Sequence, residues 1–353
     1  MKIRGILGWM VMAALVAGCK PKSAPRGTRP PTVECLVKTT PVKDQGESPL
    51  CWAYAMLATI ESEHLMKGDS VNLSPQYVGR MFLEEQAQRY YLTGGKEPIS
   101  LRGMGSALLR LIQRYGLTHY DAYHPEANFR VMERKVEKIA NMDIGRRLGT
   151  EGLRKHVADA LDGGIRPLPK FVFMHGAEYT VQEFARSVCM EDEYLAFTSF
   201  THHPFGERFV LESADNYYRD EFMNIPIDKM MHYIDQALRS GHPVCWEGDI
   251  SEPLFSFPTG VAKMENEREK ITQDMRQRAF EQLETTDDHC MELIGIAHTA
   301  KGRKYYVCKN SWGTNNPFGG LMYMSENYLR AKTLAVWMSR EAIENDKSSY
   351  IGF

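Results

Sequence analysis

Cys51 is the residue of this chain whose type and surroundings most directly suggest chemistry. It stands next to Trp52, six residues after Gln45, and follows the turn-forming run Gly-Glu-Ser-Pro. A thiol at a helix N-terminus can act as a nucleophile, because the helix dipole and a nearby imidazolium both favour the thiolate. It also needs a base within hydrogen-bond reach and a third group that orients the base. The alternative is a thiol that only packs in the core.

Two motifs in the second half of the chain offer the base and the orienting group. His289 begins one predicted strand, and Asn310, in the run Asn-Ser-Trp-Gly, follows another. If these two strands pair, His289 and Asn310 meet at one end of the sheet. The residues therefore predict a Cys-His-Asn arrangement whose members come together only in the folded chain.

Three segments carry a family resemblance. The runs PVKDQGESPLCWAYA, DHCMELIGIAH and YYVCKNSWGTN resemble, in this order, the active-site blocks of the papain-like cysteine peptidases. Cathepsin-type members usually carry Cys-Gly where this chain has Ser48 and Pro49. That difference removes a disulfide and leaves the nucleophile in place.

The resemblance can be narrowed to one branch of that family. Residues 179–209, 224–253 and 310–329 are similar to bleomycin hydrolases and bacterial aminopeptidase C enzymes, and the likeness covers the chain from about 40 to about 343. The chain is short for this branch, so we expect the helical hook insertion of its barrel-shaped hexamers to be reduced or absent. The oligomeric state stays open.

The resemblance implies a role for each motif residue. Cys51 would be the nucleophile, and His289 would carry the proton to the leaving amine. Asn310 would orient the imidazole, and Trp312 would shield their hydrogen bond from water. The Gln45 side-chain amide and the Cys51 backbone N–H would bind the developing oxyanion.

Two other residue pairs are candidate sites. Gly94 and Gly95 resemble the glycine pair that binds substrate backbone in the family, with a plain loop as the alternative. His202 and His203 are adjacent histidines without spaced partners, which favours a loop over a metal site. We expect neither a metal nor an organic cofactor.

The elements that must position these residues follow from hydrophobic periodicity. Helical patterns dominate the first half, including residues 51–67, 74–90, 106–117 and 131–142, and Ser74 is the predicted N-cap of the second. Short strand-like runs follow after about residue 240, preceded by an amphipathic helix over 227–241. The charged stretch 265–288 is expected to form a solvated surface helix. The predicted class is α+β, a papain-like two-lobed fold with a helical N-terminal lobe (about 50–160), a β-rich C-terminal lobe (about 240–340) and the active-site cleft between them.

The first eighteen residues have the layout of a secretory signal. Lys2 and Arg4 precede an apolar run that ends in small residues before Cys19, a pattern similar to the bacterial lipobox. Residues 1–18 are therefore expected to be a lipoprotein signal peptide, 19–33 a flexible tether and 34–353 the peptidase domain. The alternatives are a plain cleaved signal or an anchor helix.

The resulting prediction is an exported, membrane-anchored bacterial lipoprotein that hydrolyses peptide bonds. A formal net charge of -2 argues against nucleic acid as a partner and leaves peptide or protein substrates. The resemblance to that branch implies aminopeptidase action, because there the C-terminal arm lies in the cleft and its carboxylate holds the α-ammonium of the substrate. In this chain the Phe353 carboxylate would hold it. The alternatives are an endopeptidase with an open cleft, an acyltransferase, or a non-catalytic peptide-binding protein. Of the seven cysteines, the five other than Cys19 and Cys51 are expected to be mostly buried free thiols, with one disulfide as the alternative in an exported protein.

Overall fold

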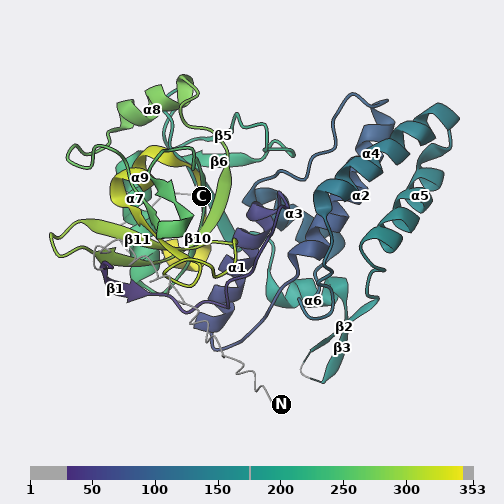
Figure 1. Ribbon diagram of the computed structural model, residues 1–353, viewed down its shortest axis with the longest axis horizontal. Coiled ribbons are helices and arrows are strands. Elements are labelled where there is room, and N and C mark those ends of the chain that lie inside the picture. Colours follow the sequence, from purple (N-terminus) through teal and green to yellow (C-terminus); the bar gives the residue numbers. More distant parts are fainter. Residues whose placement is uncertain (1–29, 175, 345–353) are drawn as a thin grey trace, which may run out of the picture. The chain divides into compact units, whose positions relative to one another are not determined.

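A helical half and a β-rich half make up the computed structural model, which describes residues 30–174 and 176–344 (Figure 1). From Pro31 onward the described residues form one unit. The expectations for Cys19, for the signal and tether before residue 30, and for the tail that ends at Phe353 lie outside the described residues.

The helical half begins with a helix that is buried on nearly every side. Residues Trp52 to Glu63 of this helix, α1, are all buried, so it runs through the interior between the other helices and the sheet. The predicted Ser74 N-cap of the next helix is confirmed, since its Oγ accepts a hydrogen bond from the Tyr77 N–H at 3.1 Å. The helices and the small hairpin of this half are α1 (Cys51–Met66), α2 (Pro75–Leu92), α3 (Gly105–Tyr115), α4 (Phe129–Arg146), α5 (Gly149–Gly164), β2 (Phe171–Met174), β3 (Ala177–Thr180) and α6 (Val181–Val188).

One mixed sheet forms the other half. Among the described residues it has eleven strands, in the order β5-β6-β4-β13-β7-β10-β11-β12-β9-β8, with β1 paired to β10. The strands are β1 (Thr32–Leu36), β4 (Tyr194–Thr198), β5 (Arg208–Val210), β6 (Glu221–Asn224), β7 (Val244–Gly248), β8 (Phe255–Ser256), β9 (Val261–Ala262), β10 (His289–His298), β11 (Lys304–Lys309), β12 (Leu321–Ser325) and β13 (Thr333–Ser339). The sheet therefore extends beyond the predicted range of about 240–340, because β1 and β4 to β6 join it from earlier in the chain.

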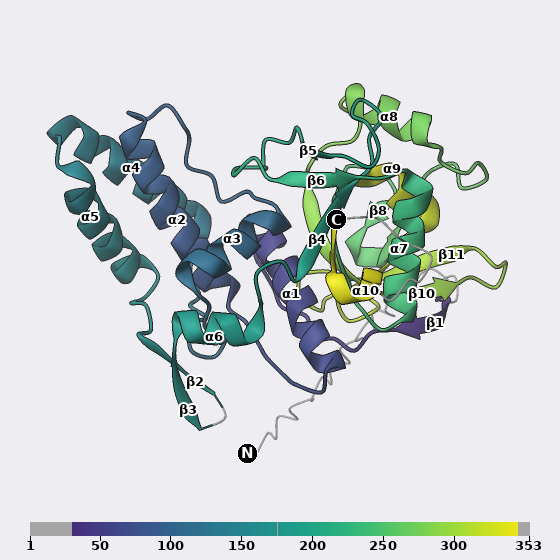
Figure 2. The same cartoon turned by 180° about the vertical axis from the view of Figure 1, so that it is seen from behind.

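Short helices complete the β-rich half. They are α7 (Ile227–Arg239), η1 (Phe257–Thr259), α8 (Gln273–Glu281), α9 (Glu326–Lys332) and α10 (Arg340–Glu344). Helix α7 packs against β1, β7 and β10 on the face of the sheet away from α1 (Figure 2). The two larger apolar cores of the described residues lie between the sheet and the helical half and beneath α7. No helix of the described part is long and apolar enough to cross a bilayer.

The charged stretch 265–288 differs from the surface helix expected of it. Only Gln273–Glu281 is helical, and Arg276 on this helix is 1% exposed. Its guanidinium donates to the Ser199 carbonyl oxygen at 2.9 Å and lies over the Phe200 ring. A charged side chain can be buried where carbonyl oxygens accept its donors, and such partners are invisible in a local charge pattern.

Candidate active site

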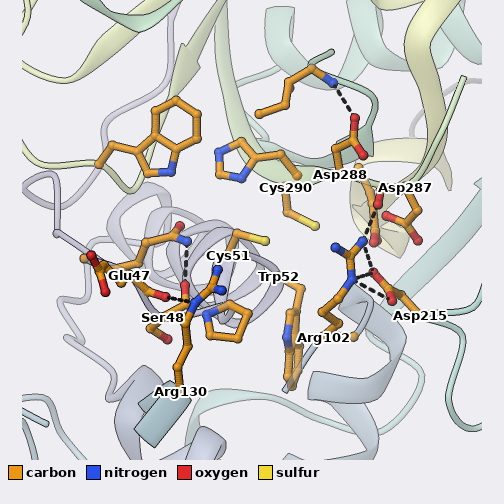
Figure 3. Close-up of a pocket in the computed structure, with 18 residues that line it drawn as sticks. Glu47, Ser48, Cys51, Trp52, Arg102, Arg130, Asp215, Asp287, Asp288 and Cys290 are labelled. Atoms are coloured by element: carbon orange, nitrogen blue, oxygen red, sulfur yellow. Dashed lines mark hydrogen bonds and ion pairs between the residues drawn. The ribbon is translucent and has the colours of Figure 1, made fainter. Parts of the chain in front are cut away.

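A cavity of about 190 Å³ opens at the N-terminus of α1. Figure 3 shows the side chains that surround it. The helical half and its entry loop supply one wall and the sheet supplies the other, so the cavity forms only when the two halves pack. The lining residues are Gln45, Gly46, Glu47, Ser48, Pro49, Cys51, Trp52, Arg102, Gly103, Arg130, Asp215, Glu247, Ile250, Asp287, Asp288, His289, Cys290 and Trp312.

Cys51 is the first residue of α1 and is partly exposed, whereas the residues that follow it are buried. Trp52 anchors this end of the helix, because its Nε1–H donates to the Leu101 carbonyl oxygen at 2.9 Å in a buried hydrogen bond. Packing of α1 against the sheet on one side and other helices on the other thus fixes the thiol at the cavity, and its sulfur lies close to that of Cys290 (Figure 3).

His289 and Asn310 meet as the strand pairing requires. His289 is the first residue of β10, Asn310 follows the last residue of β11, and these strands pair antiparallel. His289 Nε2 lies 2.8 Å from Asn310 Oδ1, and both residues are buried. The Trp312 ring covers the imidazole, with the two ring centroids 4.6 Å apart. Burial protects this hydrogen bond from competition by water.

The surroundings of Cys51 favour its thiolate. A hydrogen bond with the Cys290 thiol is the largest cause that holds the pKa of Cys51 well below its usual value. Burial opposes this, and a hydrogen bond with His289 and the attraction to its imidazolium add to the lowering. Burial raises the pKa of Cys290 well above its usual value, so Cys290 stays protonated and can donate. The site therefore pairs a thiol whose ionised form is favoured with a thiol whose protonated form is favoured.

Gln45 is held in an orientation that leaves a donor for the cavity. Its Oε1 accepts a hydrogen bond from the Ser311 hydroxyl at 2.5 Å, and its Nε2 donates one hydrogen to the Ser48 carbonyl oxygen at 2.8 Å. The Gln45 backbone N–H also donates to the Ser311 carbonyl oxygen at 2.8 Å. Since Nε2 carries two hydrogens, the second can serve an oxyanion near Cys51.

The structure does not bring Gly94 and Gly95 into this lining. Both have positive φ, at 66° and 81°, and their N–H groups bond to the Tyr91 and Tyr90 carbonyl oxygens just past the end of α2. Glycine is favoured there because the left-handed backbone that ends a helix strains other residues. Arg102 and Gly103, from the segment between α2 and α3, line the cavity instead.

Sequence reasoning missed several residues of the cavity. Cys290 carried a signal, since it directly follows His289 on a strand that was already predicted. Arg102 pairs with Asp215 at 2.8 Å across 113 positions, and no local pattern marks such a pair. Glu247 and Asp287 also face the cavity, although their segments were read only as a strand and a surface helix.

A second cluster lies away from the cavity. His202 Nε2 is 3.2 Å from one Glu212 oxygen, and His203 Nε2 is 2.7 Å from the other. The ligand atoms of these three residues lie within 4.8 Å of one another. The histidine pair occupies a loop, as predicted, and Glu212 is the spaced partner that the sequence did not reveal.

Cysteine pairing is resolved for the described residues. Cys35, Cys51, Cys189, Cys245, Cys290 and Cys308 are all free thiols, and four of the six are buried. This agrees with the expectation of mostly buried free thiols.

A helical half and a β-rich half that enclose a Cys-His-Asn cavity define the papain-like class of proteins. Comparison with known families supports this: a model described as the Peptidase C1-like family matches residues 176–351. The structure of PepW from Lactobacillus rhamnosis HN001 has a TM-score of 0.69 with this chain at 16% identity, over 91% of this chain and 86% of PepW. The chain therefore has the papain-like fold, and its second half matches the Peptidase C1-like family.

Two further solved structures match less well. A structure from work on the mite allergens Blo t 1 and Der p 1 has a TM-score of 0.45 at 18% identity, over 85% of this chain and 67% of that one. The bromelain protease from Ananas comosus, in complex with the E64 inhibitor, has a TM-score of 0.41 at 15% identity, over 85% of this chain and 94% of its own.

Proposed function

We propose that the protein is a cysteine peptidase that hydrolyses peptide bonds through an acyl-enzyme on Cys51. The observation that carries this proposal is the low pKa of Cys51 beside a His289 ring that is hydrogen-bonded to Asn310 at 2.8 Å. A thiolate next to an oriented imidazole is the pairing that nucleophilic catalysis by cysteine needs.

Each step of peptide-bond hydrolysis can be assigned to a residue of this site. The Cys51 thiolate attacks the scissile carbonyl carbon, and the oxyanion that forms accepts hydrogen bonds from Gln45 Nε2 and the Cys51 backbone N–H. The His289 imidazolium then gives its proton to the leaving amine as the C–N bond breaks, which leaves a thioester on Cys51. Neutral His289 next takes a proton from water, whose oxygen attacks the thioester. The acid product leaves, and the Cys51 thiolate and the His289 imidazolium are restored.

Thiol reactivity tests the nucleophile directly. Iodoacetamide should alkylate Cys51 far faster than any other cysteine of the intact protein, and His289→Ala should slow the reaction, because the imidazolium stabilises the thiolate. Cys308, which is buried and has a pKa raised by burial, is the internal control. Peptide hydrolysis should disappear in Cys51→Ala. Equal alkylation of Cys51 and Cys308, or hydrolysis that survives in Cys51→Ala, would contradict the assignment.

We further propose that the enzyme acts as an aminopeptidase, with an open-cleft endopeptidase as the alternative. Support comes from the resemblance to the bleomycin hydrolase and aminopeptidase C branch, in which the C-terminal arm lies in the cleft. Deletion of residues 347–353 should reduce cleavage of a free aminoacyl substrate relative to an N-acetylated peptide. If the intact protein cuts both equally well and the deletion changes neither, the endopeptidase reading replaces this one.

We also propose that the protein is exported and anchored through lipid on Cys19. Support comes from the basic residues, the apolar run and the small residues that precede this cysteine. Cys19→Ser should release the protein from membranes or leave it unprocessed, because acyl chains supply the membrane affinity. Mass spectrometry that finds an unmodified mature N-terminus beyond Cys19 would contradict this proposal.

A further inference from the structure

The wall of the cavity next to Cys290 is acidic. Asp215, Glu247, Asp287 and Asp288 all line the cavity together with Arg102, whereas Arg130, also in the lining, donates to the Glu47 backbone oxygen, and His289 bonds to Asn310. Arg102 is already engaged: its Nε donates to Asp215 Oδ2 at 2.8 Å, and its Nη2 donates to the Asp287 backbone oxygen. The Arg102–Asp215 pair is therefore close to neutral. The carboxyl groups of Glu247 and Asp287 have no cation of the described chain among their hydrogen-bond or ion-pair partners.

Strand register places Glu247 beside the reacting thiol. Glu247 on β7 is directly opposite Cys290 on β10, so both side chains lie on the face of the sheet that meets α1. Cys290 in turn is the neighbour that contributes most to the lowered pKa of Cys51. Glu247 is thus one residue removed from the nucleophile, at the inner end of the cavity.

One oxygen of Glu247 is left without a partner in the interior. Glu247 is 1% exposed, and its Oε2 has no hydrogen-bond partner among the described residues. Asp287 is the titratable neighbour of this carboxyl group, and its own Oδ2 accepts from the Ser213 hydroxyl. A buried polar atom of this kind is costly unless something that enters the site satisfies it.

The free protein reduces this cost by protonation. Burial raises the pKa of Glu247 well above its usual value, and the nearby Asp287 adds to the shift. Burial also raises the pKa of Asp287, to about 6. Burial thus favours the protonated form of Glu247 and opposes full ionisation of the pair. A cation in the cavity would favour the second ionisation, because it offers both charge and donors to the unpartnered oxygen.

We infer that Glu247 and Asp287 form a subsite that binds a cationic nitrogen group of the peptide substrate beside Cys51. The group is either the α-ammonium of a free N-terminus or the side chain of a Lys or Arg residue next to the scissile residue. This inference rests on the proposed peptidase function, since the cation belongs to the peptide that Cys51 cleaves. It assigns the recognition of that cation to two residues of the sheet, independently of the C-terminal tail.

Binding to the inactive Cys51→Ala protein tests the subsite without turnover. Calorimetry would compare three peptides of equal length: N-acetylated with arginine, N-acetylated with norleucine, and norleucine with a free N-terminus. At least one cationic peptide should bind about 10- to 100-fold more tightly than the neutral one, the range expected of a hydrogen bond to a charged group. Its binding should also release a proton at pH 7, as Glu247 ionises. The two cationic peptides distinguish a side chain from an α-ammonium.

Matched variants assign the effect to the two carboxyl groups. Glu247→Gln should abolish both the preference for a cation and the proton release, and Asp287→Asn should weaken the preference in a protein that keeps Glu247. Glu47→Gln removes one charge from the exposed rim of the same cavity, and it should change the preference less than twofold, since solvent screens exposed charges. Circular dichroism would show that each variant is folded.

Two results would overturn the subsite. One is equal affinity for the three peptides, or no binding of any. The other is a cation preference that persists in both Glu247→Gln and Asp287→Asn. Hydrolysis of the neutral acetylated peptide by the Cys51-containing protein is measured separately. Cys51-dependent cleavage of this peptide without a cation preference would contradict the subsite and leave the peptidase function standing. A cation preference without cleavage would support the subsite and contradict the peptidase function.

Discussion

Cys290→Ala is the most direct perturbation of the charge on Cys51. The Cys290 thiol is 1% exposed, and its hydrogen bond is the largest cause of the low pKa of Cys51. A hydrogen bond to a charged acceptor contributes about 1.5 to 3 kcal/mol. Because one pKa unit corresponds to about 1.4 kcal/mol, its loss should raise the pKa of Cys51 by about 1 to 2 units. The hydrogen bond and charge of His289 remain, so the thiolate is weakened but not abolished.

The rate of iodoacetamide alkylation as a function of pH measures this shift. Alkylation needs the thiolate, so the acid limb of the profile should move to higher pH by about the same 1 to 2 units in Cys290→Ala. The acid limb gives an apparent pKa that belongs to the coupled Cys51–His289 pair. The quantity compared between the variants is therefore this apparent pKa. The acid limb of kcat/KM for a neutral peptide should move in the same direction.

Two matched variants separate the hydrogen bond from packing. Cys290→Ser keeps a donor at the same position and should move the acid limb less than Cys290→Ala. Cys308→Ala removes another buried thiol, on β11, and should leave the limb in place. An unchanged acid limb in Cys290→Ala, or equal shifts in Cys290→Ala and Cys308→Ala, would refute the reasoning.

Three further predictions concern stability and positioning. The pKa of Asp287 is raised to about 6 in the folded protein, so this group stabilises the fold below about pH 4, and the contribution is lost as the pH rises through about 6. In Asp287→Asn, the unfolding free energy measured with urea should therefore fall less between pH 4 and about 6. Ser311→Ala removes the hydrogen bond that holds Gln45 Oε1 and should lower kcat about 10-fold with little change in KM. This fall is smaller than the one expected when the oxyanion donor itself is lost in Gln45→Ala, and an equal fall in kcat in both variants would contradict a positioning role for Ser311. Trp52→Phe leaves the Leu101 carbonyl oxygen unpaired and should cost about 1 to 3 kcal/mol of unfolding free energy, whereas an unchanged urea midpoint would show that water replaces the donor.

The elements that carry the site could be predicted because their signals are local. Helix α1 follows a turn-forming run, and α2 begins at a Ser-Pro pair whose serine caps it. Strands β7, β10, β11 and β12 are short aromatic or aliphatic runs with breakers between them. The surface helix predicted over 265–288 is confirmed only for Gln273–Glu281, and its buried Arg276 was not predicted, because the partners of that side chain come from residues 54 to 77 positions away.

The family resemblance depends on residue type and order, and both are properties of the sequence. Gln45, Cys51, His289 and Asn310 were singled out because nucleophile, base and orienting amide each need one kind of side chain. The glycine pair 94–95 satisfied the same kind of pattern, but a glycine also ends a helix, and the sequence cannot tell these two uses apart.

What surrounds the nucleophile was decided by tertiary structure alone. The register of β7 against β10 sets Glu247 opposite Cys290, and the packing of α1 on that face brings both to Cys51. A shift of one residue in that register would turn Glu247 to the other face of the sheet, with the same sequence. The amino-acid sequence thus determines which groups can react. The pKa of the thiol and the charge of the cavity depend on distances and burial, which exist only after residues more than two hundred positions apart have packed together.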